Sequence, residues 1–317
     1  MATLKDVAKK AGVSTATVSR VLRNIGYIKD ETHKKVTSAA RELGYIANHT
    51  AQQLKKNSVK TVGFIISDIN NPYYFNILSK LKTALREHGY DLIVSFSSEN
   101  PEEEVDSFRS LIASRVSAIL FTPTNNENFE IIGIAEQNKI KVIQLFRDVY
   151  PELDAVINDD ESGCAAATRA LLDVGCKRLL LVDVEYLYMD FDDVKPNRSV
   201  GFLSALKETA GIEYKIFHYP LVDYSKETLY KLIGQFKPDG IITATSNFGY
   251  VALSYINEKK LNAKLISFDD NKWLKLSSIT AIKQNTDILI NTISDMIFSD
   301  KIGLRKEKIR QELIIRG

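Results

Sequence analysis

From residue 59 onward, short runs of apolar, often β-branched residues alternate with amphipathic stretches that are long enough to form helices. Thr61–Ser67 is the first apolar run, and Phe75–His88 is the first amphipathic stretch. Repeated alternation of this kind predicts parallel sheets that are covered by helices on both faces. Further strands are predicted at Leu92–Phe96, Ala118–Thr122, Val142–Leu145, Leu179–Asp183, Gly240–Thr243 and Leu265–Phe268, and further helices at Pro101–Ser114, Glu127–Asn138, Ser162–Val174, Asn197–Ala210, Lys226–Phe236 and Phe248–Lys259.

The alternating region, residues 59–317, is longer than most single domains. We therefore predict a body made of two doubly wound α/β lobes with parallel sheets. Ligands of such folds bind at the carboxyl ends of the strands, often in a cleft between domains. A ligand site between the two lobes is expected.

Residues 1–58 have a different pattern. The seven prolines of the chain all lie at or beyond Pro72, so this part can be helical throughout. Apolar residues recur at helical spacing in Leu4–Ala11, Ser14–Leu22 and Thr32–Leu43. We predict an all-α head over residues 1–58, which precedes the two-lobed body over residues 59–317.

The head is also strongly basic. The chain has a formal net charge of +2, yet residues 1–58 hold eleven Lys and Arg against four Asp and Glu. A small basic unit joined to an acidic body indicates that the head binds a polyanion.

The head has the layout of a helix-turn-helix. Thr3 and Asp6 form a capping-box pattern at the start of the first helix, Gly12 favours its end, and Ser14 can cap a second helix. In a helix-turn-helix, the second helix presents its N-terminal residues to the major groove of DNA. The side chains predicted to face outward from this helix are Thr15, Ala16, Thr17, Ser19, Arg20 and Arg23.

The stretch LKDVAKKAGVSTATVSRVLR at Leu4–Arg23 resembles the start of the LacI/GalR family of regulators, and so does GYIAN at Gly44–Asn48. The resemblance implies that Thr15, Ala16 and Arg20 read operator bases, with Ser19 on a phosphate. The sequence departs from the family at Lys29, which replaces a usual serine and leaves Asp30 as the candidate cap of the third helix.

The same resemblance implies a hinge helix between about Asn48 and Asn57. Its wedge in the minor groove would be Leu54. A segment this short and polar is not stable as an isolated helix, so it is expected to order against DNA.

The body resembles the same family in Asp68–Tyr74, in the pattern Arg198-x-x-Gly201-Phe202-x-x-Ala205-Leu206 and in Phe268-Asp269-Asp270. The resemblance implies two lobes like those of periplasmic sugar-binding proteins, with an effector between them. Arg198 can hold paired hydroxyls or a carboxylate, Asp269 can accept from sugar hydroxyls, and Tyr73 and Tyr224 offer aromatic faces.

Two departures affect the predicted effector site. Phe146 stands where relatives commonly have a ligand-binding aspartate, and Thr245 with Ser246 replaces a usual asparagine–aspartate pair. Losing acceptors and gaining an aromatic ring argues against a plain hexose in the usual pose.

Other classes of protein lack support in the sequence. No window approaches the roughly 18 apolar residues of a membrane span, and charges from Lys5 onward leave no signal-peptide core. Cys164 and Cys176 cannot form a disulfide framework, so a cytoplasmic location is predicted. GxGxxG, GxxxxGK[ST], HExxH and GxSxG are absent, and the histidines lack metal-ligand spacing. We expect no catalysis, cofactor or metal.

The predicted function is that of a transcription regulator, most simply a repressor, controlled by a small-molecule effector such as a sugar or a sugar derivative. One helix-turn-helix reads too few base pairs, so a homodimer on pseudo-palindromic double-stranded operator DNA is expected. The chain ends just after QELIIRG, which resembles the family's last strand, and this favours a dimer over a tetramer.

Two alternatives stay open at this stage. One is a regulator with a vestigial pocket that is controlled by a protein partner. The other is an α/β enzyme with an appended DNA-binding module, which the missing phosphate loops disfavour.

Overall fold

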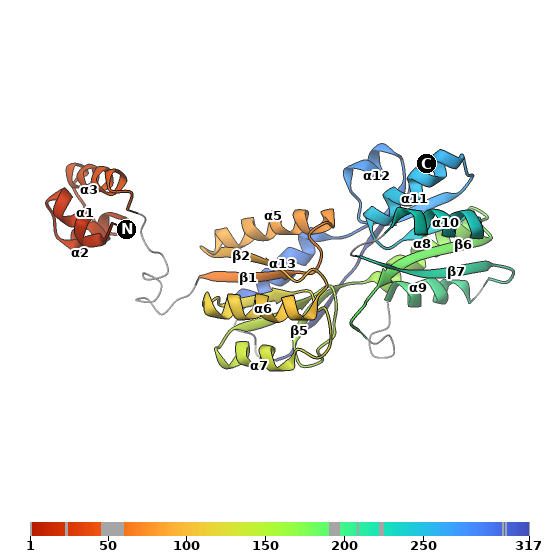
Figure 1. Cartoon of the computed structure of the whole chain (residues 1–317), viewed down its shortest axis with the longest axis horizontal. Coiled ribbons are helices and arrows are strands. Elements are labelled where there is room, and N and C mark those ends of the chain that lie inside the picture. The colour runs from red at the N-terminus through yellow and green to blue at the C-terminus, as the bar shows by residue number, and fades with distance from the viewer. Residues whose placement is uncertain are drawn as a thin grey trace. The chain divides into compact units, whose positions relative to one another are not determined.

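A computed structural model describes residues 2–22, 25–45, 60–189, 197–207, 209–221, 225–299, 301 and 303–316 (Figure 1). The chain divides into two compact units, Met1–Val59 and Lys60–Gly317. We call the first unit the head and the second the body.

Three helices form the head: α1 (Leu4–Ala11), α2 (Thr15–Leu22) and α3 (Asp30–Glu42). They pack around Val7, Val18 and Val36, which are fully buried. Apolar residues at helical spacing thus come together in one small core, which holds α2 by one face and leaves its other face to solvent.

The predicted starts of α1 and α2 are confirmed. Thr3 and Asp6 form a reciprocal capping box, and Gly12 ends α1 with φ 65°. Ser14 Oγ accepts from the amide of Thr17 at 3.1 Å. The predicted cap of α3 is wrong: Lys29 occupies the cap position without a side-chain hydrogen bond, and Asp30 is the first helical residue.

The first lobe of the body is built on a six-stranded parallel sheet in the order β11-β5-β4-β3-β1-β2. Its strands are β1 (Thr61–Ile66), β2 (Asp91–Phe96), β3 (Ala118–Phe121), β4 (Lys141–Leu145), β5 (Asp154–Asn158) and β11 (Lys306–Ile309). Its helices are α5 (Pro72–Glu87), α6 (Pro101–Ala113), α7 (Phe129–Gln137) and α13 (Thr286–Phe298).

The second lobe has a sheet in the order β12-β10-β9-β8-β6-β7, parallel except for the pairing of β12 with β10. Its strands are β6 (Arg178–Glu185), β7 (Glu213–Pro220), β8 (Gly240–Thr243), β9 (Lys264–Phe268), β10 (Thr280–Lys283) and β12 (Glu312–Ile314). Its helices are α8 (Asp160–Asp173), α9 (Asn197–Leu206), α10 (Lys226–Phe236), α11 (Ser246–Lys259) and α12 (Lys272–Leu276).

Each sheet is buried on both faces, which explains the continuous apolar runs of its central strands. In the first lobe, Phe64 points into one core and Ile65 into the other, and both are fully buried. Leu180 and Leu181 alternate in the same way in the second lobe. The prediction of two doubly wound lobes is confirmed.

The chain passes between the lobes at three places, after β5, after β10 and after β11. Helix α13 returns to the first lobe, where Leu289 and Ile293 join its core. The three crossings lie side by side between the two lobes (Figure 1). Side chains near Asp160, Gln284 and Gln311 therefore meet there, although they are far apart in sequence.

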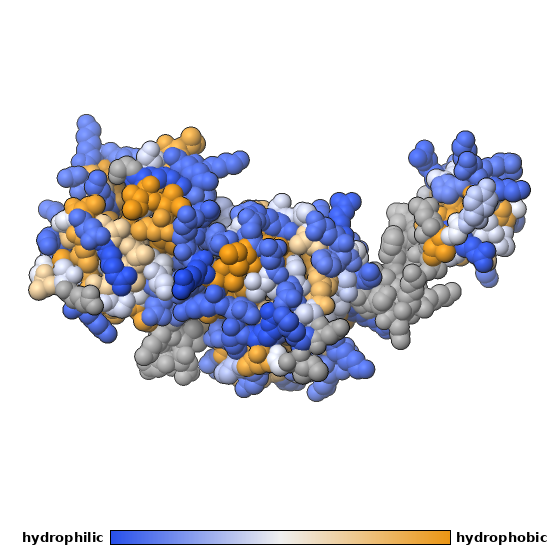
Figure 2. All heavy atoms as spheres, turned by 180° about the vertical axis from the view of Figure 1, so that it is seen from behind, coloured by the Kyte–Doolittle hydropathy of each residue, from blue (hydrophilic) through white to orange (hydrophobic). Residues whose placement is uncertain are grey.

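On the face in Figure 2, the surface is mostly hydrophilic, and apolar residues gather there in several separate patches. No helix in the described ranges is long and apolar enough to cross a membrane.

Candidate functional site

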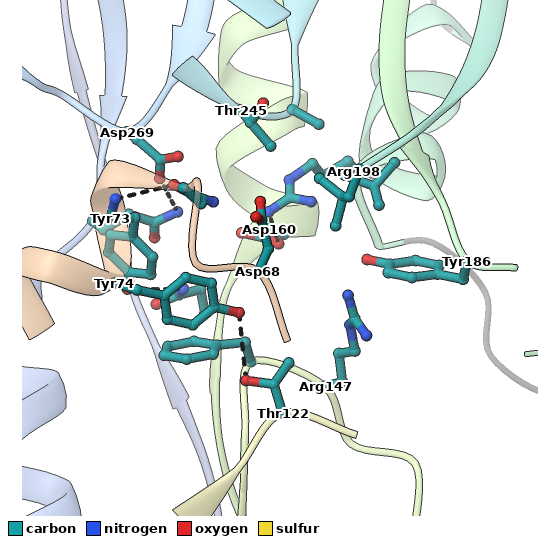
Figure 3. A pocket seen from close by; sticks show the side chains of 17 residues that line it. Asp68, Tyr73, Tyr74, Thr122, Arg147, Asp160, Tyr186, Arg198, Thr245 and Asp269 are labelled. Carbon is teal, nitrogen blue, oxygen red and sulfur yellow. Dashed lines mark hydrogen bonds and ion pairs between the residues drawn. The ribbon is translucent and has the colours of Figure 1, made fainter. Parts of the chain in front are cut away.

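A cavity of about 70 Å³ lies between the two lobes of the body, where the carboxyl ends of their strands meet. The first lobe contributes Asp68 after β1 and Arg147 after β4. The second lobe contributes Tyr186, Arg198 and Asp269 (Figure 3). This volume is small beside the roughly 300–1,000 Å³ of sites that hold small molecules.

Arg198 is held at the first turn of α9 with its charge paired. Its Nη2 lies 2.6 Å from Oδ2 of Asp160, and its guanidinium lies 4.7 Å from the ring centroid of Phe268. Burial opposes the charge of Arg198, but Asp160 outweighs burial and raises the pKa of the guanidinium. Among the described residues, no partner binds the buried Nε of Arg198, which leaves one donor for a ligand.

Asp269 follows β9, is buried, and lines the cavity together with Tyr73 of the first lobe (Figure 3). Its Oδ1 accepts from Nε2 of Gln284 at 3.4 Å. Burial raises the pKa of Asp269 to about 6, although Arg198 favours the charged form. A ligand that donates hydrogen bonds would stabilise this carboxylate.

Arg147 closes the cavity from the first lobe. Its guanidinium donates to both carboxylate oxygens of Glu99, at 2.8 and 2.7 Å, and to the carbonyl of Pro123 at 2.7 Å. The Arg147 guanidinium also faces the ring of Tyr186 in the second lobe, 4.5 Å from its centroid (Figure 3). This cation–π contact links the lobes directly, as does the bond from Asn247 Nδ2 to the carbonyl of Asn70 at 3.2 Å.

An aromatic wall lies on the first-lobe side. Phe146 packs edge-on against Tyr73 and Tyr74, with ring centroids 5.6 Å apart in both pairs. The hydroxyl of Tyr73 accepts from Asn158 Nδ2 at 3.3 Å. Rings held in this way are rigid surfaces against which the apolar face of a sugar can stack.

Two residues that line the cavity, and Glu99 behind them, have backbone conformations that non-glycine residues rarely adopt. Glu99, Phe146 and Asp269 have φ values of 55°, 67° and 67° just after strands β2, β4 and β9. Left-handed conformations of this kind are unfavourable and occur preferentially at functional sites. They turn the side chains from the ends of the strands toward the cleft.

A chain of hydrogen bonds connects the wall to the three crossings between the lobes. Gln311 Nε2 donates to Asp160 at 2.5 Å and to Gln284 Oε1 at 2.7 Å. Asp160 pairs with Arg198, and Gln284 donates to Asp269. A ligand that moves Arg198 or Asp269 therefore acts on residues at all three crossings.

The structure brings four of the five predicted effector-binding residues to this cavity: Tyr73, Phe146, Arg198 and Asp269. The fifth, Tyr224, lies outside the described residues. Sequence reasoning did not find Arg147, Glu99 or Asp160. The available signal was position, since Arg147 and Asp160 each follow a strand by two residues.

In the head, α2 presents Thr15 and Ala16 in its first turn and Arg20 in its last turn to solvent, while Thr17 and Ser19 are half-buried. The hydroxyl of Thr17 lies 2.9 Å from that of Ser14 and belongs to the cap. The other predicted DNA-binding residues are Arg23, Asn48 and Leu54. These three, and the predicted hinge helix, lie outside the described residues.

Two family models match the chain. The first, described as bacterial regulatory proteins of the lacI family, matches residues 3–48. The second, described as periplasmic binding proteins and sugar binding domain of LacI family, matches residues 59–315, which is most of the chain.

Among individual proteins, the sucrose operon repressor of Streptococcus mutans is 29% identical over 308 residues, which cover 94% of this chain and 92% of the relative. The structure of the lac repressor dimer bound to operator and the anti-inducer ONPF matches with a TM-score of 0.77 at 22% identity, over 99% of this chain and 98% of that one.

The Cra dual regulator of Pseudomonas putida, in complex with fructose 1-phosphate, matches with a TM-score of 0.74 at 19% identity, over 82% of this chain and 99% of that one. At such identities the two structures support the fold, whereas the family models extend over both head and body. The chain belongs to the LacI family of bacterial regulatory proteins and is a DNA-binding transcription regulator with a ligand-binding body.

Proposed function

We propose that the protein is a homodimeric repressor in the cytoplasm, which reads a pseudo-palindromic operator with α2. Its affinity for the operator falls or rises when a sugar-like molecule binds between the lobes. The observation that carries the proposal is the cavity itself. Charged and aromatic side chains from both lobes converge there, at the carboxyl ends of parallel strands.

In this proposal Arg198 and Asp269 are the polar anchors of the effector. The unpartnered Nε of Arg198 donates to a hydroxyl, and the Asp269 carboxylate accepts from one. Tyr73, Phe146 and Tyr224 supply aromatic faces. Small-molecule sites have volumes of roughly 300–1,000 Å³, so a sugar enters only when the lobes part and the Arg147–Tyr186 contact opens.

For DNA, Thr15, Ala16 and Arg20 are the proposed base readers and Ser19 a phosphate contact. Arg20 is exposed in the last turn of α2. Arginine recognises guanine through two parallel hydrogen bonds, and the small side chains of Thr15 and Ala16 permit close approach to the bases. Arg23, Asn48 and Leu54 complete the proposed DNA contacts.

The test is selection of duplexes from a random DNA library by the full-length protein, followed by binding measurements on the enriched sequence. We expect a two-fold symmetric motif. Arg20→Ala should weaken binding to that motif by roughly 5- to 150-fold while changing binding to random DNA little.

Arg41→Ala is the matched control, because Arg41 is exposed on α3 and carries the same charge. It should weaken specific and non-specific binding equally. No enriched motif, or equal losses in Arg20→Ala and Arg41→Ala, would contradict the assignment of α2 as the reading helix.

A further inference from the structure

The charges around the cavity do not balance. Two guanidinium groups reach it, those of Arg147 and Arg198. Each is paired with a buried carboxylate, Arg147 with Glu99 at 2.7 Å and Arg198 with Asp160 at 2.6 Å. Two cations thus meet two anions, and neither arginine adds a net positive charge to the cleft.

Two more carboxylates line the same wall. Asp68 is 5% exposed and Asp269 is 8% exposed. Within the described ranges of the chain, neither forms an ion pair with Lys or Arg. When ionised, they give the cleft a net negative charge. An anionic ligand would meet this excess of negative charge in a site sheltered from water, where such repulsion is strong.

The pairing of Arg147 is held in place by a strained segment. Ser98 and Glu99 have φ values of 50° and 55°, and the amide of Glu99 donates to the carbonyl of Ser67 at 2.9 Å. The side chains of Arg147 and Glu99 are only 9% and 11% exposed. Ser98 and Glu99 thus both keep an unfavourable left-handed conformation. This conformation places the Glu99 carboxylate against the Arg147 guanidinium.

Three of the five N–H groups of Arg147 already have acceptors. Nη1 donates to Glu99 and to Pro123, Nη2 donates to Glu99, and the ring of Tyr186 lies against the guanidinium. A phosphate could bind the fork of Nη1 and Nη2 only by displacing this bidentate carboxylate.

We propose that Glu99 is a specificity-determining residue: by neutralising Arg147 it excludes ligands that carry a phosphate or carboxylate group and restricts the cleft to uncharged or amine-bearing polyols. The inference rests on the proposed function of the cleft as the effector site. It assigns Arg147 to closure of the lobes rather than to capture of an anion.

The experiment uses the full-length protein and inorganic phosphate as the probe, with sodium chloride at matched ionic strength as the reference. Thermal unfolding of the body is followed by the fluorescence of its single tryptophan, Trp273. Because Glu99→Gln leaves Arg147 without a counter-charge, phosphate should raise the midpoint of this variant by about 2–4 °C. The wild-type midpoint should rise only by the general stabilising effect of phosphate, which is smaller than this and shared by the control variant.

Asp106→Asn is the matched control, because it removes a carboxylate from an exposed arginine pair, with Arg109, on α6. It should respond to phosphate as the wild type does. If Glu99→Gln does not fold, Glu99→Ala serves the same purpose, because it also leaves Arg147 without a counter-charge, and the same rise is expected.

A phosphate-dependent rise in the wild type as large as that in Glu99→Gln would overturn the proposal. Failure of a folded Glu99 variant to respond to phosphate would do so as well. The measurement involves no operator DNA, so its failure leaves the regulator function standing. Failure of the DNA selection described above would in turn leave this result unchanged.

Discussion

At the residue scale, Asp269 and Asp270 are neighbours in sequence with opposite electrostatic roles. Burial raises the pKa of Asp269 to about 6. For Asp270, burial also raises the pKa, but the contacts with Arg316 at 2.7 Å and Lys275 at 3.5 Å outweigh it and lower the pKa overall. The first charge therefore destabilises the fold, and the second stabilises it.

These roles predict opposite effects of the same substitution. The folded state binds a proton at Asp269 more tightly than the unfolded chain does, so ionisation costs stability above pH 6 and costs none below about pH 4. Asp269→Asn should raise the free energy of unfolding at pH 7.5 by about 1–3 kcal/mol, and the gain should vanish toward pH 4. Urea titrations at both pH values measure it.

Asp270→Asn is the matched comparison. Its ion pairs contribute stability above the unfolded pKa, and this contribution is lost as the pH falls through the lowered pKa. The variant should be less stable than the wild type at pH 7.5. A loss of stability in Asp269→Asn at pH 7.5 would contradict the electrostatic account of the wall.

The sequence identified some wall residues and missed others for a physical reason. Arg198 and Asp269 lie in short local patterns that can be read along the chain. Glu99 and Arg147 are 48 residues apart and come from different strand ends, and only the order of strands in the sheet brings them together. Pairing between distant residues leaves no local trace.

At the element scale, the packing of α9 on α8 fixes the position of Arg198. A Cβ at Gly201 would lie 2.0 Å from the backbone carbonyl oxygen of Glu161, so no side chain fits there. The glycine lets the two helices approach closely enough for Arg198 to reach Asp160.

Gly201→Ala should therefore force α9 away from α8, and overpacking of this kind costs about 1–3 kcal/mol. Gly133→Ala in α7 is the control, because a Cβ there meets no atom within 4 Å. The helix propensity of alanine should stabilise that variant by about 0.5–1 kcal/mol. Thermal melts of both variants measure the difference, and equal midpoints would show that α8 and α9 can separate without cost.

The strands that are buried along most of their length were predicted closely, whereas β5 and β10 were not predicted. The central strands β1, β3 and β8 lie within one residue of their predicted ends. Strand β7 was missed because it is an edge strand with exposed residues at its start, and β11 (KEKI) is too polar to read as buried. Their pairing partners, rather than their own side chains, make them strands.

At the scale of the whole molecule, the head and the body have separate cores. Deletion of residues 1–58 should leave a folded body with its ligand site and without specific DNA affinity. Circular dichroism and gel-shift assays test this together. Unfolding of the body, or retained operator binding, would contradict the assignment of DNA binding to the head and ligand binding to the body.

The proposed homodimer has a candidate face on the body. Phe75, 62% exposed on α5, lines a groove of about 840 Å³ with Trp273 of α12, and Tyr250, 61% exposed, packs edge-on against Trp273 at 5.8 Å. Phe75→Asp should shift the protein toward monomer in sedimentation. Phe129→Asp, which alters a 55% exposed ring on α7, should not. Equal behaviour of the two variants would place the dimer contact elsewhere.

The central claim is that a ligand in the cleft controls operator binding through Arg198. The measurement that tests it is the anisotropy of labelled operator DNA, titrated with full-length wild type and Arg198→Ala, with and without a ligand found by thermal shift. The ligand should change wild-type operator affinity, because Arg198 connects through Asp160 and Gln311 to the crossings between the lobes.

Arg198→Ala should bind operator as the wild type does without ligand. Its ligand affinity should fall by about 30- to 150-fold, since a charge-assisted hydrogen bond in a buried site is lost. Arg198→Lys, which keeps a cation beside Asp160 but lacks the planar fork, shows whether a loss of folding is responsible. We predict that adding the ligand leaves the operator affinity of Arg198→Ala unchanged. A change in operator affinity as large as that of the wild type would contradict the central claim.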